Sequence, residues 1–191
     1  MLDHIITSQT RREILTLFFQ HPSDSYYLRD IVRRIDEEVN AVKRELDILV
    51  DGKLLTSERR LNKVFFTLNP QYRYYDEFLR IFMRTSVLAE QIRENLPKLG
   101  KIKYISLSLK YAKRQDVRPD EIYLLVVGTI VVPEVAQIIA YTQQDFGREV
   151  NYSVMSEDEF TFRKRSNDPF IWKFLRTPKV MLHGQEEEMN K

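Results

Sequence analysis

The stretch VNAVKRELDILVDGKLLTSERRLNKVFFTLNP, residues 39–70, decides the fold of the first part of the chain. Apolar side chains recur in its first half at the spacing of one helical face, which predicts a helix over residues 39–50 with that face against a core. Two short apolar runs, Leu54–Ser57 and Val64–Leu68, then flank a polar turn at residues 58–63, and this pattern predicts a β-hairpin. The residues expected to face the core from the helix are Val39, Val42, Leu46 and Leu49.

Two further helices are expected before this stretch. In SQTRREILTLFFQHP, residues 8–22, an apolar helical stripe follows the candidate N-cap residues Ser8 and Thr10. In YYLRDIVRRI, residues 26–35, apolar side chains again recur at helical spacing, and the arginines are expected to point outward. The acidic run at residues 36–38 then separates the second helix from the third.

Helix, helix, turn, helix and hairpin is the order of a winged helix-turn-helix, and residues 1–70 resemble the arsenic-repressor-type winged-helix transcriptional regulators. The segments that carry the resemblance are TRREILTLFF, YYLRDIVRRI, VNAVKRELDILVDGKLL and RRLNKVFFTLNP. The resemblance implies that residues 39–50 form the helix that reads DNA and that residues 59–63 form the tip of the wing. It also implies a homodimer on double-stranded DNA, because related regulators place two such helices about one DNA turn apart.

The side chains expected to touch DNA lie on the outer face of the third helix and on the hairpin. Those on the helix can reach base edges in the major groove, while the basic ones on the hairpin can neutralise phosphates or enter the minor groove. Alternatively, these are solvated faces of a winged helix that contacts another protein. The acidic run at residues 36–38 stands against DNA, although a helix N-terminus favours acidic residues in any case. The candidate DNA contacts are Asn40, Ala41, Lys43, Arg44, Arg59, Arg60 and Lys63.

The composition is that of a soluble globular protein with one large or two small domains, since 43% of the 191 residues are hydrophobic and 30% are charged. There is no cysteine, which excludes disulfides and thiolate metal sites and favours the reducing cytoplasm. The first residues lack the apolar region of a secretion signal, and a run of about 18 apolar residues is absent. We therefore expect a cytoplasmic protein without a membrane segment.

The net charge of +2 is unevenly distributed along the sequence. Residues 1–70 carry 11 basic and 11 acidic side chains, residues 71–115 carry 10 and 4, and residues 116–191 carry 9 and 13. Because residues 1–70 have no net charge, DNA binding by this segment depends on where its individual basic side chains lie.

Residues 71–100 are predicted to form a helical connector. Apolar residues keep helical spacing from Tyr74 to Leu99, and Ser86 marks a break between two helices. This apolar stripe makes the connector a candidate dimer seam. We expect dimerisation, because one copy with so little net positive charge would bind DNA weakly and two copies double the phosphate contacts.

Residues 101–184 alternate strands with helices, which predicts a small α/β domain, and residues 185–191 are expected to form a disordered, charged tail. The whole chain is thus expected to be of the α+β class, with a winged helix-turn-helix, a helical connector and a small α/β domain. The expected strands are KIKYISLSL, EIYLLVVG, REVNYSVM and KVMLHG, and the expected helices are PEVAQIIAYTQQDFG, SEDEFTFRKRS and PFIWKFLRTP.

The segments SLSLKYAKRQDVRPDEIYLLVVG, FGREVNYSVMSEDEF and RTPKVMLHG resemble the minimal nucleotidyltransferase fold of the polymerase-beta superfamily. The resemblance implies a Gly-Ser pair for phosphates, an Asp-x-Asp for magnesium and a third carboxylate. This sequence has Leu109 and Lys110 at the first place and Glu121 and Tyr123 at the second, and NYSVM has no acid in its middle. A neutral tyrosine cannot replace a bridging carboxylate, and a leucine side chain hinders phosphate approach to the backbone. We therefore expect no catalytic residue, no metal and no cofactor.

Three functions stay open on these grounds. The leading one is a transcriptional regulator whose inactive transferase-like domain serves dimerisation or ligand sensing. The second is a nucleotidyltransferase targeted by its winged helix, with Asp120 shifted into register, and the third is an antitoxin-like protein that binds another protein. A basic loop in the second domain either binds an anionic small-molecule effector or is merely solvated. Its candidate anion-binding residues are Lys110, Lys113, Arg114 and Arg118.

Overall fold

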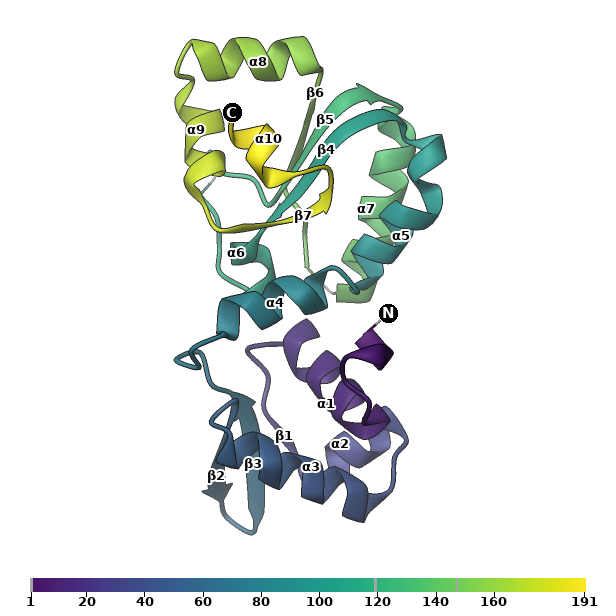
Figure 1. Ribbon diagram of the computed structural model, residues 1–191, viewed down its shortest axis with the longest axis vertical. Coiled ribbons are helices and arrows are strands. Elements are labelled where there is room, and N and C mark those ends of the chain that lie inside the picture. Colours follow the sequence, from purple (N-terminus) through teal and green to yellow (C-terminus); the bar gives the residue numbers. More distant parts are fainter. Residues whose placement is uncertain (1, 119, 147) are drawn as a thin grey trace. The chain divides into compact units, whose positions relative to one another are not determined.

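The apolar patterns of the sequence become helices and strands close to their expected positions, and the chain is of the mixed α+β class (Figure 1). The computed structural model describes residues 2–118, 120–146 and 148–191. They belong to two compact units, Met1–Phe82 and Met83–Lys191. The division lies inside residues 71–100, the segment that the sequence predicts as a helical connector.

The first unit packs helices on a small antiparallel sheet with the strand order β1-β3-β2. Phe18, Leu46 and Phe66 belong to its core. Phe19 and Phe82 stack with their ring centroids 5.0 Å apart, which joins the last helix of this unit to the first. The elements are η1 (Leu2–His4), α1 (Gln9–Gln20), β1 (Tyr26–Tyr27), α2 (Leu28–Ile35), α3 (Val39–Asp51), β2 (Leu55–Arg60), β3 (Lys63–Leu68) and α4 (Tyr75–Met83).

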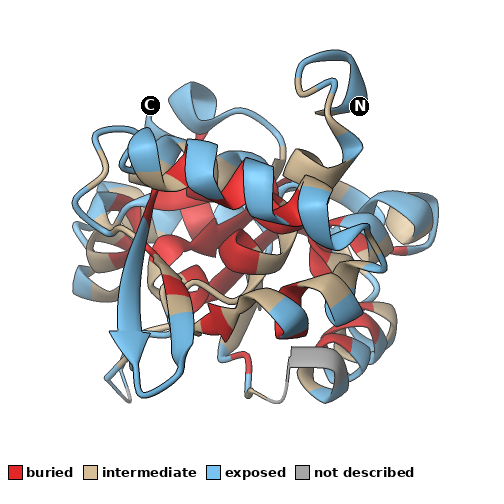
Figure 2. Cartoon of the chain, turned by 90° about the horizontal axis from the view of Figure 1, so that it is seen from below, coloured by how far each residue is buried: buried red, intermediate tan, exposed pale blue. Residues whose placement is uncertain are grey.

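The hairpin has longer strands than the sequence predicts. A turn is predicted over residues 58–63, but β2 and β3 continue through it and still pair at Arg60 and Lys63. Leu61 and Asn62 alone connect the two strands. Polarity does not end an exposed ladder, because antiparallel pairing satisfies the backbone of polar and apolar residues alike. The hairpin therefore projects from the unit, and β2 is exposed from Thr56 to Arg60 (Figure 2).

The prediction that Val39 faces the core is wrong, because its side chain is 45% exposed. It is the first residue of α3, and the buried face of the helix starts only at Val42 and includes Glu45. The buried carboxylate of Glu45 accepts hydrogen bonds from the Ser8 hydroxyl at 2.8 Å and from Arg11 Nε at 2.7 Å. Ser8 is also the N-cap of α1. These bonds satisfy the carboxylate and join α3 to the start of α1.

The second unit is built on a sheet with the order β6-β5-β4-β7, in which β5 and β6 are parallel and the other neighbours are antiparallel. Leu124 and Val126 face α5 and α7, whereas Leu125 and Val127 face α8, α9 and α10 (Figure 1). The run YLLVV is continuously apolar because both faces of its strand are covered. The elements are α5 (Val87–Asn95), η2 (Leu96–Lys98), β4 (Gly100–Ser108), α6 (Leu109–Ala112), β5 (Leu124–Ile130), α7 (Val132–Phe146), β6 (Tyr152–Met155), α8 (Glu157–Arg165), α9 (Pro169–Arg176), β7 (Lys179–His183) and α10 (Glu186–Asn190).

Several predicted boundaries in this unit are confirmed. The helical stripe of the connector breaks at Ser86, which is the N-cap of α5, and Ser156 is the N-cap of α8. The helix predicted over residues 133–147 is α7. Its expected last residue, Gly147, lies outside the described residues.

Gly128 lies inside β5 instead of ending it. Its φ is 149°, and a Cβ at this position would lie 2.3 Å from the carbonyl oxygen of Lys101. The close approach occurs where β4 shifts register between Ile102 and Tyr104. Glycine is therefore required by the neighbouring strand, and β5 continues to Ile130.

The prediction of a disordered tail at residues 185–191 is wrong. Glu186–Asn190 form the helix α10, and Met189 is 0% exposed in the core of the second unit. Lys164 Nζ also donates a hydrogen bond to the Met189 carbonyl oxygen at 2.8 Å. The prediction of a tail was based on the acidic composition of residues 185–191. Met189 is the residue of this segment whose burial holds α10 against the core.

We expect Met189→Ala to destabilise the second unit by about 2–5 kcal/mol, because it removes a fully buried side chain and leaves a cavity. Trp172 is the single tryptophan and lies against the same core, so its fluorescence during urea unfolding reports on this unit. The control Glu187→Ala changes an exposed residue of α10 and should shift the unfolding free energy by less than about 0.5 kcal/mol. Equal stability of Met189→Ala and the wild type would show that α10 does not dock.

Candidate nucleic-acid interface

The outer face of α3 carries the predicted helix contacts. Asn40, Lys43 and Arg44 are exposed, and Ala41 is half-buried. Within the described part of the chain, the side chains of Lys43 and Arg44 form no hydrogen bond or ion pair. They are available to an external partner.

Charge changes sign along this face of α3. Lys43 and Arg44 occupy its first half, whereas the exposed Asp47 and Asp51 follow in its second half. The N-terminal end of a helix also carries the positive end of the helix dipole. An anionic partner is therefore attracted to the beginning of α3 and repelled from its end.

Two of the three acidic residues before α3, Asp36 and Glu37, have local roles. Asp36 adopts the left-handed conformation at the end of α2, with φ 51°, which aspartate tolerates better than most residues. Glu37 accepts a hydrogen bond from the Thr10 hydroxyl at 3.1 Å. Asp36 therefore contributes to the turn between α2 and α3 through its backbone and Glu37 through its side chain, whereas the side chain of Glu38 does not cap α3.

Arg33 and Arg34, predicted to point outward, both pair with Asp30, at 2.7 Å and 3.2 Å. Burial raises the pKa of Asp30, but the hydrogen bonds from the two arginines outweigh this effect and lower its pKa overall. Their i,i+3 and i,i+4 spacing is a sequence signal for these pairs. The charges of Arg33 and Arg34 are therefore partly neutralised by a residue of their own helix.

The basic residues of the hairpin are divided between its two faces. Arg60 and Lys63 are cross-strand partners on one face, where Arg60 pairs with Glu58 at 2.7 Å and Lys63 Nζ lies 4.0 Å from the centre of the Tyr27 ring. Arg59 pairs across the strands with Val64 on the other face, the face that also carries the buried Phe66. Arg59 is exposed and makes no side-chain hydrogen bond or ion pair within the described residues.

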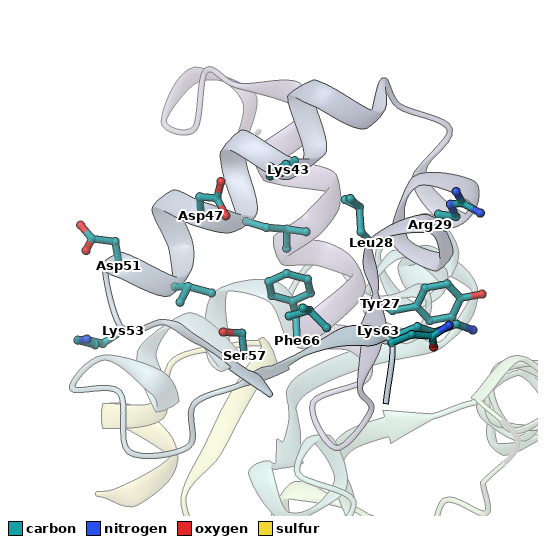
Figure 3. A pocket seen from close by; sticks show the side chains of 14 residues that line it. Tyr27, Leu28, Arg29, Lys43, Asp47, Asp51, Lys53, Ser57, Lys63 and Phe66 are labelled. Atoms are coloured by element: carbon teal, nitrogen blue, oxygen red, sulfur yellow. The ribbon is translucent and has the colours of Figure 1, made fainter. Parts of the chain in front are cut away.

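A groove of about 780 Å³ separates α3 from the hairpin (Figure 3). Its lining side chains come from α2, α3 and both strands, so segments distant in sequence combine to form it. Its charged lining residues comprise four cations and two anions. The apolar lining residues are Leu28, Leu46, Val50, Val64 and Phe66, and the charged ones are Arg29, Lys43, Asp47, Asp51, Lys53 and Lys63.

The basic loop of the second unit has an internal partner in Glu121. Lys110 Nζ lies 2.9 Å and Lys173 Nζ 3.2 Å from its carboxylate, and the backbone N–H of Arg118 donates to it at 3.2 Å. Lys173 also pairs with Asp120 at 2.7 Å. The hydrogen bond from Lys110 is the main reason that the pKa of Glu121 falls to about 2. Lys173, which lies on α9, had no sequence signal because it is far along the chain.

The four candidate anion-binding residues do not share one environment. Lys110 is turned to Glu121, and Arg118 reaches the same carboxylate through its backbone. Lys113 follows the last turn of α6, and Arg114 comes next with a left-handed φ of 52°. The space beside Lys110 and Glu121 measures about 10 Å³, roughly the room for one water molecule.

Tyr123 is buried just before β5 and forms a contact with Arg148. Its hydroxyl donates to the carbonyl oxygen of Gln115 at 2.9 Å and accepts a hydrogen bond from Arg148. The Arg148 guanidinium lies 4.8 Å from the centre of the Tyr123 ring and 5.6 Å from that of Tyr111. The tyrosine thus anchors the loop after α6.

Groups of three or more histidine and carboxylate side chains that could hold a metal ion are absent from residues 2–118, 120–146 and 148–191. None of the helices in these ranges has the length and apolar character to cross a membrane.

The ion pairs of Glu121 make the stability of the second unit pH-dependent. Because its pKa is lowered from 4.5 to about 2, its contribution is fully present above pH 4.5 and is lost as the pH falls towards 2. We expect Glu121→Gln to lower the unfolding free energy by up to about 3 kcal/mol at pH 7 and by much less at pH 3. Urea unfolding followed by Trp172 fluorescence measures both differences. Glu149→Gln, at an exposed carboxylate, is the matched control, and an equal loss at pH 3 and pH 7 would contradict the assignment.

Comparisons with known proteins add little to this description. No protein-family model and no curated protein matches the chain. Among solved structures, it is similar to human N-acetylserotonin methyltransferase in complex with SAM, at 15% identity and a TM-score of 0.30. The match covers 49% of this chain and 32% of the methyltransferase, about a third of its length. A similarity of this size carries no argument about fold or function.

Proposed function

We propose that the first unit is a winged helix-turn-helix that binds double-stranded DNA and that the chain is a sequence-specific transcriptional regulator. The observation that carries the proposal is the position of three exposed cations without side-chain hydrogen bonds or ion pairs in the described chain. Lys43 and Arg44 lie on the first half of α3, and Arg59 lies on the hairpin across the groove.

In this proposal, the first half of α3 enters the major groove. Asn40 and Arg44 are of the types that read adenine and guanine edges, and residues at the N-terminal end of a helix are the ones that reach them. Asp47 and Asp51 repel phosphates from the second half of α3. The duplex is thereby oriented with its base contacts at one end of the helix.

At the end of the groove that carries Lys43 and Lys63, away from Asp47 and Asp51, we place the sugar–phosphate strand between a major and a minor groove (Figure 3). Lys43 and Lys63 line this end from its two sides, and Ser57 and Asn62 add hydrogen-bonding groups to the lining. Phosphate contacts of this kind fix the register of a protein on DNA without reading sequence. Arg59 adds a cation on the face of the hairpin that carries Phe66, and Arg60 adds one on the opposite face.

For the second unit, we propose a nucleotidyltransferase-like domain without catalytic activity that serves dimerisation or the sensing of an anionic ligand. In this proposal Glu121 takes the position of a magnesium-binding aspartate, and both of its oxygens accept from lysines. A homodimer is proposed because two copies double the phosphate contacts. Its interface is not the apolar stripe of α5, because Leu88 and Ile92 are buried within the second unit.

Two substitutions distinguish base reading from phosphate contact. Arg44→Ala should weaken binding to the preferred duplex by about 1–3 kcal/mol and leave binding to unrelated duplexes nearly unchanged. Arg59→Ala should weaken binding to all duplexes and reduce the slope of log K against log salt by about one. Fluorescence anisotropy at several salt concentrations, on a duplex selected from genomic fragments by the wild type, measures both effects.

Arg165→Ala is the matched control, since Arg165 is an exposed arginine of the second unit. It should bind both kinds of duplex like the wild type. Equal losses on every duplex from Arg44→Ala and Arg59→Ala would remove the assignment of α3 as the reading helix.

The rival function is tested with magnesium and a labelled nucleoside triphosphate. We expect no transfer of label to protein or small molecules above that of a heat-denatured sample. Transfer that is abolished by Glu121→Ala and retained by Glu149→Ala would establish an enzyme instead.

A further inference from the structure

Leu61 is the most exposed of the large apolar side chains described, at 97%. It is the first residue of the two-residue loop between β2 and β3, so its whole side chain extends into solvent at the tip of the hairpin. Single exposed apolar residues are common on protein surfaces. The position of this one is unusual because its backbone also disfavours leucine.

The backbone of Leu61 is left-handed, with φ 54°. Such a conformation at the first position of a two-residue hairpin loop favours glycine, and a side chain there costs about 1–2 kcal/mol. Asn62, which tolerates this conformation better, occupies the next position, where φ is not positive. A leucine at position 61 is therefore favoured neither by the backbone conformation of the turn nor by its exposure to water.

The tip is strongly cationic for its size. Residues 58–63 contain three basic and one acidic side chain, a net charge of +2, while residues 1–70 are neutral as a whole. Arg60 and Lys63 are held against Phe65 and Tyr27, with cation-to-ring distances of 5.3 Å and 4.0 Å. Leu61 is thus an apolar tip flanked by positioned cations.

The hairpin that presents this tip is continuously paired. Every residue of β2 has a partner in β3, and the hydroxyls of Thr56 and Thr67 are hydrogen-bonded across the strands at 2.8 Å. β3 is also paired with β1, which anchors the hairpin to the rest of the unit. Leu61 is therefore presented on a supported structure.

We propose that Leu61 enters the minor groove of bound duplex DNA and wedges against a base step, while Arg59, Arg60 and Lys63 contact the flanking phosphates. The inference rests on the proposed DNA binding and adds a preference for a deformable pyrimidine–purine step beside the sequence read by α3. Apolar wedges of this kind partly unstack and kink the duplex, and such steps deform most easily. The flanking cations favour a polyanion over an apolar protein surface, and one leucine offers too little area to anchor the chain to a membrane.

The test uses Leu61→Gly and Leu61→Met on the duplex most enriched by the wild type from a randomised pool. 2-Aminopurine beside the deformable step reports unstacking by a rise in fluorescence. The wild type and Leu61→Met should produce this rise, whereas Leu61→Gly should lose it and bind roughly tenfold more weakly. The salt slope should stay unchanged in Leu61→Gly, because no charge is removed.

Folding provides an independent control. Glycine relieves the left-handed strain, so the melting temperature of Leu61→Gly should equal or exceed that of the wild type. Its loss of DNA binding would then be due to the missing side chain and not to unfolding.

The outcomes separate this inference from the function on which it rests. Wild-type protein that binds no duplex would overturn both. Wild-type protein that binds, with Leu61→Gly equal to it in affinity and in 2-aminopurine signal, would overturn the wedge and leave DNA binding standing. Binding to anionic vesicles that requires Leu61, with no effect of Leu61→Gly on DNA, would also overturn the wedge.

Discussion

The buried carboxylate of Glu45 is the constraint on which the proposed DNA-binding surface depends. It lies on the packed face of α3 and accepts hydrogen bonds from Ser8 and Arg11 of the α1 end. Breaking such a buried, charge-assisted pair costs several kcal/mol, so the helix is held at one rotation about its axis. With Glu45 inward, Lys43 and Arg44 necessarily face outward.

A second carboxylate is used in a similar way in the other unit. Glu121 joins Lys110, Lys173 and the backbone of Arg118, and thereby closes the loop that follows α6. A carboxylate engaged by two ammonium groups has no oxygen that is free of a cation. These acidic and basic residues hold the loop together through their contacts with Glu121.

The helices and strands could be predicted because they depend on local periodicity. The packed face of α3, the break at Ser86 and the continuous apolar run of β5 all follow from the spacing of neighbouring residues. The errors concern residues whose environment comes from distant segments. Gly128 is required by the carbonyl of Lys101 on the next strand, and Met189 finds its core only through the fold.

The candidate site shows the same division. The exposure of Lys43 and Arg44 agrees with helical periodicity, since the buried residues of α3 lie on its other face. Arg59 is exposed although it shares a strand face with the buried Phe66, because the hairpin extends beyond the core. The partners Glu45–Arg11 and Glu121–Lys173 are separated by 34 and 52 positions, and spacing carries no signal over such distances. The sequence therefore predicts which side chains are exposed, whereas the structure shows which charges are already paired.

Methylation interference on a selected duplex shows whether α3 and the hairpin read adjacent grooves of DNA. Dimethyl sulfate modifies guanine N7 in the major groove and adenine N3 in the minor groove. We expect a short block of guanines whose methylation prevents binding, with a neighbouring adenine whose methylation in the minor groove does the same. Binding that tolerates methylation at every guanine and adenine of the duplex would contradict this expectation.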